Sequence, residues 1–160
     1  MKYYISLRTN LACLIAFGLL ATSYSQTATK NYITTYTPKV PLTDEMTVPA
    51  QTKENCIKTV QYFDGLGRPD QTIQVALSPV GKDIVQPIEY DQYGRDSIRY
   101  LPYRGGNSNG NYVTTDLTEQ SAYYLSQFPS TPDKDYPYAE TVFDNSPLNR
   151  VMKQGAPGYA

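Results

Sequence analysis

The sequence predicts a mainly β fold, an antiparallel meander of hairpins, with one short amphipathic helix near residues 117–127 and an N-terminal signal helix. The chain contains 16 tyrosines, and aromatic residues, like the accompanying valine, isoleucine and threonine, favour half-buried strands. Its 12 prolines and 10 glycines place turns between the strands at short intervals. In several segments apolar and polar residues alternate, which is the pattern of a strand with one buried face.

Strands are expected wherever this alternation is bounded by turn residues. The clearest pair covers residues 56–63 and 71–77, and the Asp-Gly turn between them predicts a β-hairpin. Pro87 indicates a free edge or a bulge within a later strand, because proline cannot donate a ladder hydrogen bond. The other expected strands cover residues 32–37, 84–90, 96–103, 138–143 and 149–154.

The apolar period changes after residue 116 and becomes that of a helix. A helix is expected over residues 117–127, and Pro129 and Pro132 end it. The residues that share its predicted buried face are Leu117, Ser121, Tyr124, Leu125 and Phe128.

The N-terminal segment is typical of a cleavable secretion signal. Lys2 and Arg8 are its only charges, and they precede an apolar run over residues 11–20 and then small residues. Cleavage is expected between Ser25 and Gln26. The chain is therefore expected to be exported, to the periplasm, the cell surface or the medium of a Gram-negative bacterium, with membrane contact only through the signal during export.

Two alternatives to cleavage are disfavoured. The apolar run is about half of the roughly 20 residues that a membrane-spanning helix needs, which argues against an anchor. Cys13 lies too early in the run, with Asn10 before it, to be a lipid-attachment cysteine. The expected organisation is a signal peptide over residues 1–25, a flexible lead-in with a short strand over 26–52, and a β-rich domain over 53–160 whose glycine-rich end indicates a fragment of a longer protein.

Charge and residue content exclude several functions. Two of the 14 basic residues lie in the signal, so the rest of the chain carries 12 against 15 acidic residues, a net charge of −3 that argues against nucleic-acid binding. Cys56 is the one cysteine after the signal, and we expect a buried residue without an internal disulfide. Histidine is absent, which excludes catalytic triads that use it and the usual zinc sites.

Three turns share one motif. YFDGLGR at residues 62–68 and EYDQYGR at 89–95 align without gaps, and VFDNSPLNR at 142–150 is a looser third copy. The structural turn residues are Tyr62, Asp64, Gly67, Arg68, Tyr90, Asp91, Gly94, Arg95, Phe143, Asp144, Asn149 and Arg150.

Each position of the motif has a physical role. The aromatic residue ends a strand and packs, and the aspartate accepts backbone N–H bonds within the turn. The glycine, or Asn149 in the third copy, provides the positive φ that reverses the chain, and valine at Gly94 would therefore be destabilising. The arginine begins the return strand and can pair with an aspartate. An alternative is a shared carboxylate cluster of Asp64, Asp91 and Asp144 for calcium or glycosidic chemistry.

The motif resembles the YD repeat of the RHS (rearrangement hotspot) family, whose consensus is Tyr-Asp, two variable residues and Gly-Arg. The segments TVQYFDGLGRPDQTIQV, PIEYDQYGRDSIRYLPY and ETVFDNSPLNRVMKQGAPG are similar to the N-terminal domain of unknown function that precedes RHS repeats in secreted bacterial proteins. The resemblance extends from about residue 32 to the end. Members of that family continue with many more repeats and a variable C-terminal region, which this sequence does not contain.

The resemblance implies a non-enzymatic scaffold without a cofactor. RHS repeats form a sheet that spirals into a hollow shell, which in some members encloses a toxin, and this chain would form its N-terminal start. The expected partner is a downstream RHS-repeat shell, in the same chain or encoded by a neighbouring gene. The alternative is a secreted module that binds carbohydrate or a cell-surface glycan, because exposed tyrosines stack on sugars. A small secreted hydrolase is disfavoured by the lack of histidine.

Overall fold

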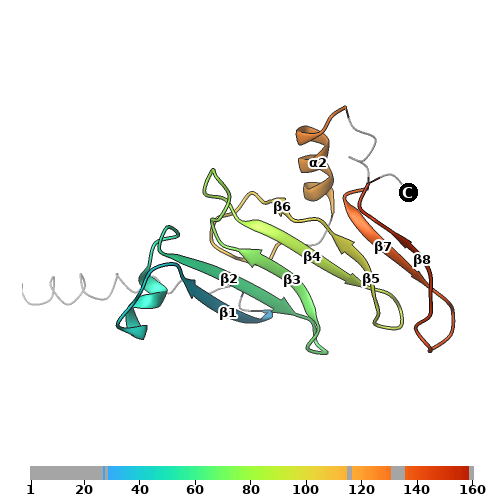
Figure 1. The fold of residues 1–160 in the computed structure, drawn as a ribbon, viewed down its shortest axis with the longest axis horizontal. Helices are drawn as coiled ribbons and strands as arrows, with labels where there is room; N and C mark the ends of the chain where they lie inside the picture. Colours follow the sequence, from blue (N-terminus) through green and yellow to red (C-terminus); the bar gives the residue numbers. More distant parts are fainter. Residues whose placement is uncertain (1–26, 28, 115–116, 131–135, 159–160) are drawn as a thin grey trace, which may run out of the picture.

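The computed structural model describes residues 27, 29–114, 117–130 and 136–158, which form one antiparallel sheet with a short helix beside it (Figure 1). The strands lie side by side in the order β1 (Asn31–Pro38), β2 (Cys56–Phe63), β3 (Pro69–Gln74), β4 (Ile84–Tyr90), β5 (Asp96–Tyr100), β7 (Tyr138–Phe143) and β8 (Val151–Gly155). A two-residue strand, β6 (Tyr103–Arg104), pairs with β4. The helical segments are the 3-10 helix η1 (Glu45–Ala50) and the α-helix α2 (Thr118–Gln127).

The predicted fold class is confirmed for the described residues, which are mainly β and antiparallel with one short α-helix. The predicted signal helix and its cleavage site between Ser25 and Gln26 lie outside the described residues.

Two strands end earlier than predicted, and each has a local reason. The strand expected over residues 71–77 ends at Gln74, because Ala76 adopts a φ of 52° and its N–H turns away to the Asp83 carboxylate. The strand expected over 96–103 is divided into β5 and β6. The intervening residues Leu101 and Pro102 leave the ladder, and the Leu101 N–H donates to the carbonyl of Pro137 at 2.9 Å.

Pro87 lies in an interior strand and not at a free edge. It is opposite Gln71 of β3, and β4 has further neighbours on its other side. Those neighbours change at this point, because Val85 pairs with β6 whereas Ile88 pairs with β5. The proline therefore lies at an interruption of the ladder, where a missing N–H donor is tolerated.

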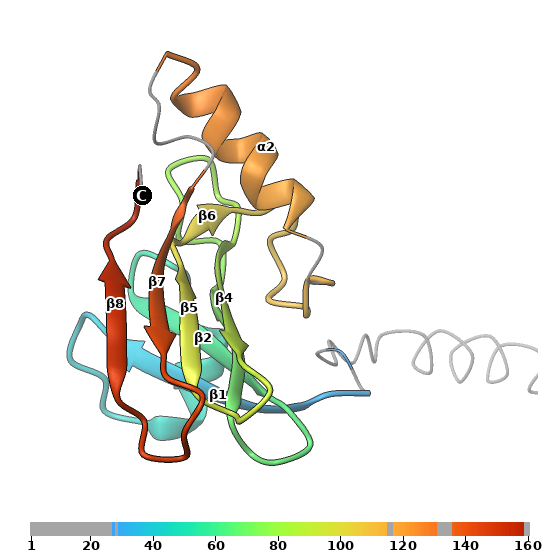
Figure 2. The same ribbon diagram turned by 90° about the vertical axis from the view of Figure 1, so that its right-hand side faces the viewer.

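The core lies on one face of the sheet. Thr34, Val60, Ile73 and Val85 are opposite one another across β1 to β4, so their side chains share this face. The segment after β6 and the helix α2 lie on the same side of the sheet (Figure 2), and their tyrosines and Val113 pack against the buried residues. Cys56 is buried at the start of β2.

The helix turns a different face to the sheet from the one predicted. Gln120 is its buried residue, and Tyr123 and Tyr124 are half-buried beside it, whereas Leu125 and Phe128 are about half exposed. A hydrogen bond explains this orientation of the helix, because the Gln120 amide donates to the carbonyl of Leu101 at 2.7 Å. A count of apolar residues cannot detect a glutamine that faces the sheet in order to bind backbone carbonyls.

Candidate functional site: a ladder of aspartate–arginine turns

The three repeated turns lie at the same end of the sheet. They join β2 to β3, β4 to β5 and β7 to β8, and the other connections lie at the opposite end (Figure 1). In each case the aromatic residue is the last of its strand, and the strand ladder carries a β-bulge at that residue. The sheet therefore presents three equivalent hairpins in sequence order.

The first turn is closed by the carboxylate of Asp64. One oxygen accepts the backbone N–H groups of Leu66 and Arg68 at 2.8 and 2.9 Å. The other accepts the Arg68 side chain through Nε at 2.8 Å and Nη2 at 2.7 Å. Gly67 has a φ of 78°, which is the left-handed region where glycine is favoured.

The second turn repeats this geometry closely. Asp91 accepts the backbone N–H groups of Tyr93 and Arg95, both at 2.9 Å, and the Arg95 Nε at 2.7 Å. Gly94 has a φ of 77°. The two turns therefore have the same local structure, in which one carboxylate binds two backbone N–H groups and one guanidinium.

The third turn is longer but keeps the same closure. Asp144 accepts the N–H and the hydroxyl of Ser146, and the Arg150 Nε at 2.8 Å. The Asp144 N–H donates to the carbonyl of Arg150 at 2.9 Å, as in the other two turns. Asn149 adopts a φ of 54° and takes the place of the glycine.

The structure corrects one member of the predicted motif. Tyr62 is fully buried in the core, and its hydroxyl donates to the carbonyl of Gly110 at 2.8 Å. Phe63 is the residue that precedes the aspartate and ends the strand, as Tyr90 and Phe143 do in the other hairpins. The sequence contained this alignment, since Phe63 is the aromatic residue directly before Asp64.

The first two arginines, Arg68 and Arg95, also reach the next hairpin, which sequence reasoning did not detect. The guanidinium of Arg68 lies 4.4 Å from the ring centroid of Tyr90, and the Tyr90 hydroxyl donates to the carbonyl of Pro69 at 2.9 Å. A Cβ atom at Gly94 would lie 2.5 Å from Nη1 of Arg68, so a glycine there leaves room for the arginine.

The same contact recurs one hairpin later. The guanidinium of Arg95 lies 4.5 Å from the ring centroid of Phe143, and its Nη1 donates to the carbonyl of Asp144 at 3.2 Å. A cation over an aromatic face is attracted by the ring quadrupole. The arginine of one turn therefore stacks on the aromatic residue of the next, and we call this series of contacts the arginine ladder.

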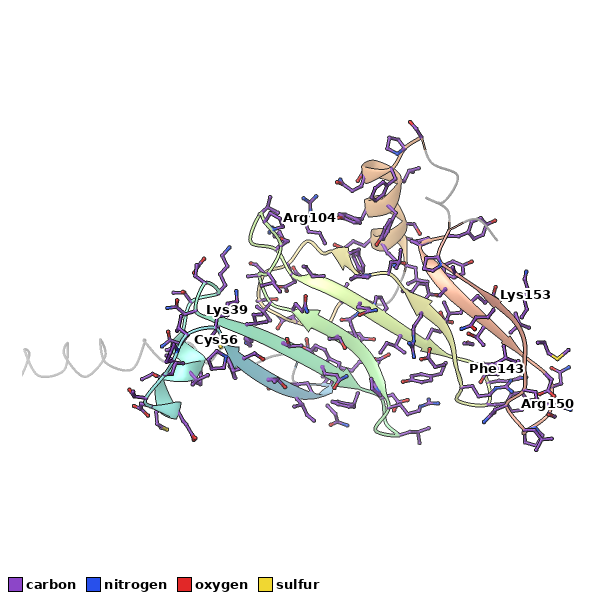
Figure 3. The ribbon with its side chains drawn as sticks, in the orientation of Figure 1. Lys39, Cys56, Arg104, Phe143, Arg150 and Lys153 are labelled. Carbon is purple, nitrogen blue, oxygen red and sulfur yellow. The ribbon has the colours of Figure 1, made fainter. Side chains whose placement is uncertain are left out.

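The last arginine has a different environment. The Arg95 side chain is 11% exposed and that of Arg68 is 34% exposed, whereas that of Arg150 is 68% exposed. Figure 3 labels Arg150 beyond Phe143 at the outer end of the sheet. Within the described residues, Arg150 pairs with Asp144 and has no aromatic ring over it.

Hydrogen bonding lowers the pKa of all three turn aspartates below the ordinary value of 3.8. The main cause is the backbone N–H of the turn's arginine for Asp64 and the hydroxyl of Ser146 for Asp144. Desolvation is the largest influence on Asp91 and raises its pKa, but the N–H donors of the turn together outweigh it. The donors of each turn therefore stabilise the ionised form of its aspartate.

The alternative of a shared carboxylate cluster is wrong for these residues. No three aspartate, glutamate, cysteine or histidine side chains gather as metal ligands would in the part of the chain that the structure describes. Asp64, Asp91 and Asp144 belong to three separate turns, and each is occupied by donors of its own turn.

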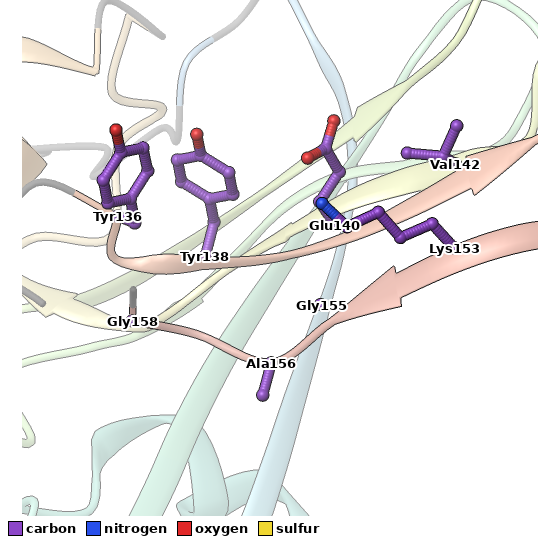
Figure 4. A pocket seen from close by; sticks show the side chains of 8 residues that line it. All are labelled: Tyr136, Tyr138, Glu140, Val142, Lys153, Gly155, Ala156 and Gly158. Carbon is purple, nitrogen blue, oxygen red and sulfur yellow. The ribbon is translucent and has the colours of Figure 1, made fainter. Parts of the chain in front are cut away.

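Among the hollows that lie elsewhere on the described surface, two are lined in part by tyrosines. A groove of about 60 Å³ between β7 and β8 is lined by Tyr136, Tyr138, Glu140 and Lys153 among others (Figure 4). A larger cleft of about 380 Å³ lies between α2 and β6 and is lined in part by Tyr103, Arg104 and Tyr123. The groove is well below the 300–1,000 Å³ typical of small-molecule sites, and the cleft is at their lower end.

Comparison with known proteins gives a family and no function. The model of a family described as a domain of unknown function (DUF6443) matches residues 34–160, from within β1 to the end. No curated protein and no solved structure matches the chain. In the described residues, no helix has the length and apolar character needed to cross a membrane.

Proposed function

The chain belongs to the DUF6443 family of domains of unknown function, and we propose that it is a non-enzymatic structural module at the N-terminal end of an exported RHS/YD-repeat protein. In this role its sheet is the first part of a larger β-shell that continues with further YD repeats. The shell serves as a scaffold, of a cell-surface protein or of a toxin-delivery protein.

The arginine ladder is the observation that carries this proposal. Its contacts involve the motif residues themselves, because the arginine of one copy stacks on the aromatic residue of the next. Any further copy that follows in the same register can therefore be added by the same contact. A motif that builds its own interface to the next copy is suited to a repetitive sheet, in which each unit contacts its neighbours.

Two further features agree with a structural role. The carboxylates of the repeated turns are engaged within their own turns, at distances of 2.7 to 2.9 Å in the first two. The chain also lacks histidine, the commonest general acid and base. The aspartates of the repeated motif thus stabilise the turns in which they lie.

The proposal is tested on the native protein. Antiserum raised against residues 26–160 is used to isolate the protein from cells, envelope and medium, and mass spectrometry gives its size and peptides. We expect an N-terminus at Gln26, recovery outside the cytoplasm, and peptides with further Tyr-Asp-x-x-Gly-Arg motifs in the same or a co-purifying chain. A cytoplasmic protein that ends at Ala160 and has no such partner would overturn the proposal.

A second candidate function is glycan binding, which the cleft beside α2 favours. The Arg104 guanidinium lies 5.7 Å from the ring centroid of Tyr123, so the cleft offers an aromatic face and a charged donor. A glycan array separates the two candidates. Reproducible binding that Tyr123→Ala abolishes and Tyr136→Ala retains would favour this second function, because Tyr136 lines the other hollow.

A further inference from the structure

We propose that the outer edge of β8, together with the exposed guanidinium of Arg150, is the docking site for one further strand that ends in an aromatic–aspartate pair. The inference rests on the proposed function and names the partner of this edge. The occupant is the first strand of the repeat region that the proposed function places after this module. It would stack its aromatic side chain on Arg150, as Tyr90 stacks on Arg68.

The outer edge of β8 is unpaired in the described residues and carries exposed apolar side chains. Within the described residues β8 pairs with β7 alone, and its residues from Val151 to Gln154 are exposed. Met152 is 70% exposed, and so is Leu148 in the preceding turn. An edge strand with unpaired backbone groups and apolar side chains readily accepts another strand.

The arginine ladder shows what kind of strand fits. Arg68 and Arg95 each lie directly before a return strand, and each stacks on the last residue of the next strand in the sheet. Arg150 lies directly before the third return strand and closes its turn through Asp144, as the other two arginines do through their own aspartates. The position equivalent to Tyr90 and Phe143 therefore lies beside β8, on a strand antiparallel to it.

A second copy of this chain does not supply that strand. The strands that end in an aromatic–aspartate pair are β2, β4 and β7, and each already has a neighbour on both sides. The other edge of the sheet is β1, which ends at Pro38. The occupant must therefore be a strand with its own copy of the motif, followed by its own return strand.

The experiment appends such a hairpin to the chain. Residues 26–160 are followed by a short glycine–serine linker and a second copy of residues 84–100, which contain the second motif. Hydrogen exchange of the β8 amides is compared with and without the appended hairpin. We expect the outward-facing β8 amides to exchange on the order of tenfold more slowly in the fusion, because a paired edge amide is protected.

Two substitutions test the arginine contact. In the fusion, R150A or a leucine in place of the appended copy's tyrosine should reduce the protection by about three- to tenfold, as expected for loss of a cation–aromatic contact. The matched control is R99A, because Arg99 is similarly exposed at 73% but lies on β5. In the chain without the hairpin, R150A removes only an exposed ion pair to Asp144, so it should change the exchange of the β8 amides by no more than about twofold. A larger loss of protection in the fusion then concerns docking.

The outcomes separate this inference from the proposed function. Unchanged β8 exchange in the fusion, or protection that R150A and R99A affect equally, would overturn the docking site. Neither result concerns the native protein, whose further repeats are sought by mass spectrometry. A native protein with repeats, combined with an unprotected β8 edge, would leave the scaffold proposal standing and remove the proposed contact.

Discussion

Arg95 and Phe143 come from different hairpins, and the guanidinium of one lies 4.5 Å from the ring centroid of the other. Arg95 also holds its own turn through Asp91 at 2.7 Å, so one side chain links two hairpins. At 11% exposure it is the most buried of the three turn arginines. The stability of the sheet across β5 and β7 should therefore depend on this pair.

A double-mutant cycle measures the pair. Arg95→Ala and Phe143→Leu should each destabilise the protein, and together by about 1 kcal/mol less than the sum, because the contact is lost only once. Urea unfolding of the four proteins gives the coupling. Arg99→Ala removes an exposed ion pair and should cost no more than about 0.5 kcal/mol. Strictly additive effects at 95 and 143 would show that the two side chains do not interact.

The glycines of the first two turns form a matched pair for a second prediction. Gly67 and Gly94 have φ values of 78° and 77°, so alanine should cost about 1 kcal/mol at either position. A Cβ at Gly94 would also meet Arg68, whereas nothing lies within 4 Å of one at Gly67. Gly94→Ala should therefore cost about 0.5–1 kcal/mol more, because it displaces Arg68 from Tyr90.

Thermal or urea unfolding of the two alanine variants checks this difference. Equal losses would mean that Arg68 reaches Tyr90 without passing over Gly94. The comparison is internal, since both turns have the same length and the same hydrogen bonds.

The hairpins were predictable because their chemistry is local. Asp64, Gly67 and Arg68 close a turn within five residues, and alternation in the flanking segments fixes which face is buried. The contact between Arg68 and Tyr90 was not predictable, because it requires the register of β3 against β4. Motif spacing shows that the copies are alike, but it does not show which copies are neighbours in the sheet.

The packing of the segment after β6 over the core was also not predictable from the sequence. Residues 105–113 are rich in glycine and asparagine and have the composition of a plain linker, yet they are tied to the sheet by buried polar groups. The Gln71 amide exchanges two hydrogen bonds with the backbone of Val113, at 2.9 and 3.1 Å. A buried glutamine in a strand has no local signature, since its partner is distant in the sequence.

Acid sensitivity follows from the turn aspartates. Their folded pKa values lie below the ordinary 3.8, so their ionised forms stabilise the folded state at neutral pH. This stabilisation is lost as the pH falls from about 4 through the folded pKa values, because protonation then removes the acceptors. Urea midpoints measured between neutral pH and pH 2 should fall over this range.

Asparagine at Asp64 and Asp91 tests the assignment. The doubly substituted protein should be less stable than the parent at neutral pH, and its urea midpoint should fall less steeply on acidification. Parallel pH profiles for the two proteins would place the acid-sensitive groups elsewhere.

Asp83 lies directly before β4, and its side chain is fully buried. Its two oxygens accept the N–H groups of Ala76 and Gly110, both at 2.8 Å, so it fixes the end of β3 and the loop that covers the core. Asp83→Ala should cost about 3 kcal/mol, because two donors lose their partners inside the protein. It should also accelerate hydrogen exchange at Gly110. Asp96→Ala removes a surface ion pair and serves as the control, and equal losses in the two variants would show that Asp83 does not hold the loop.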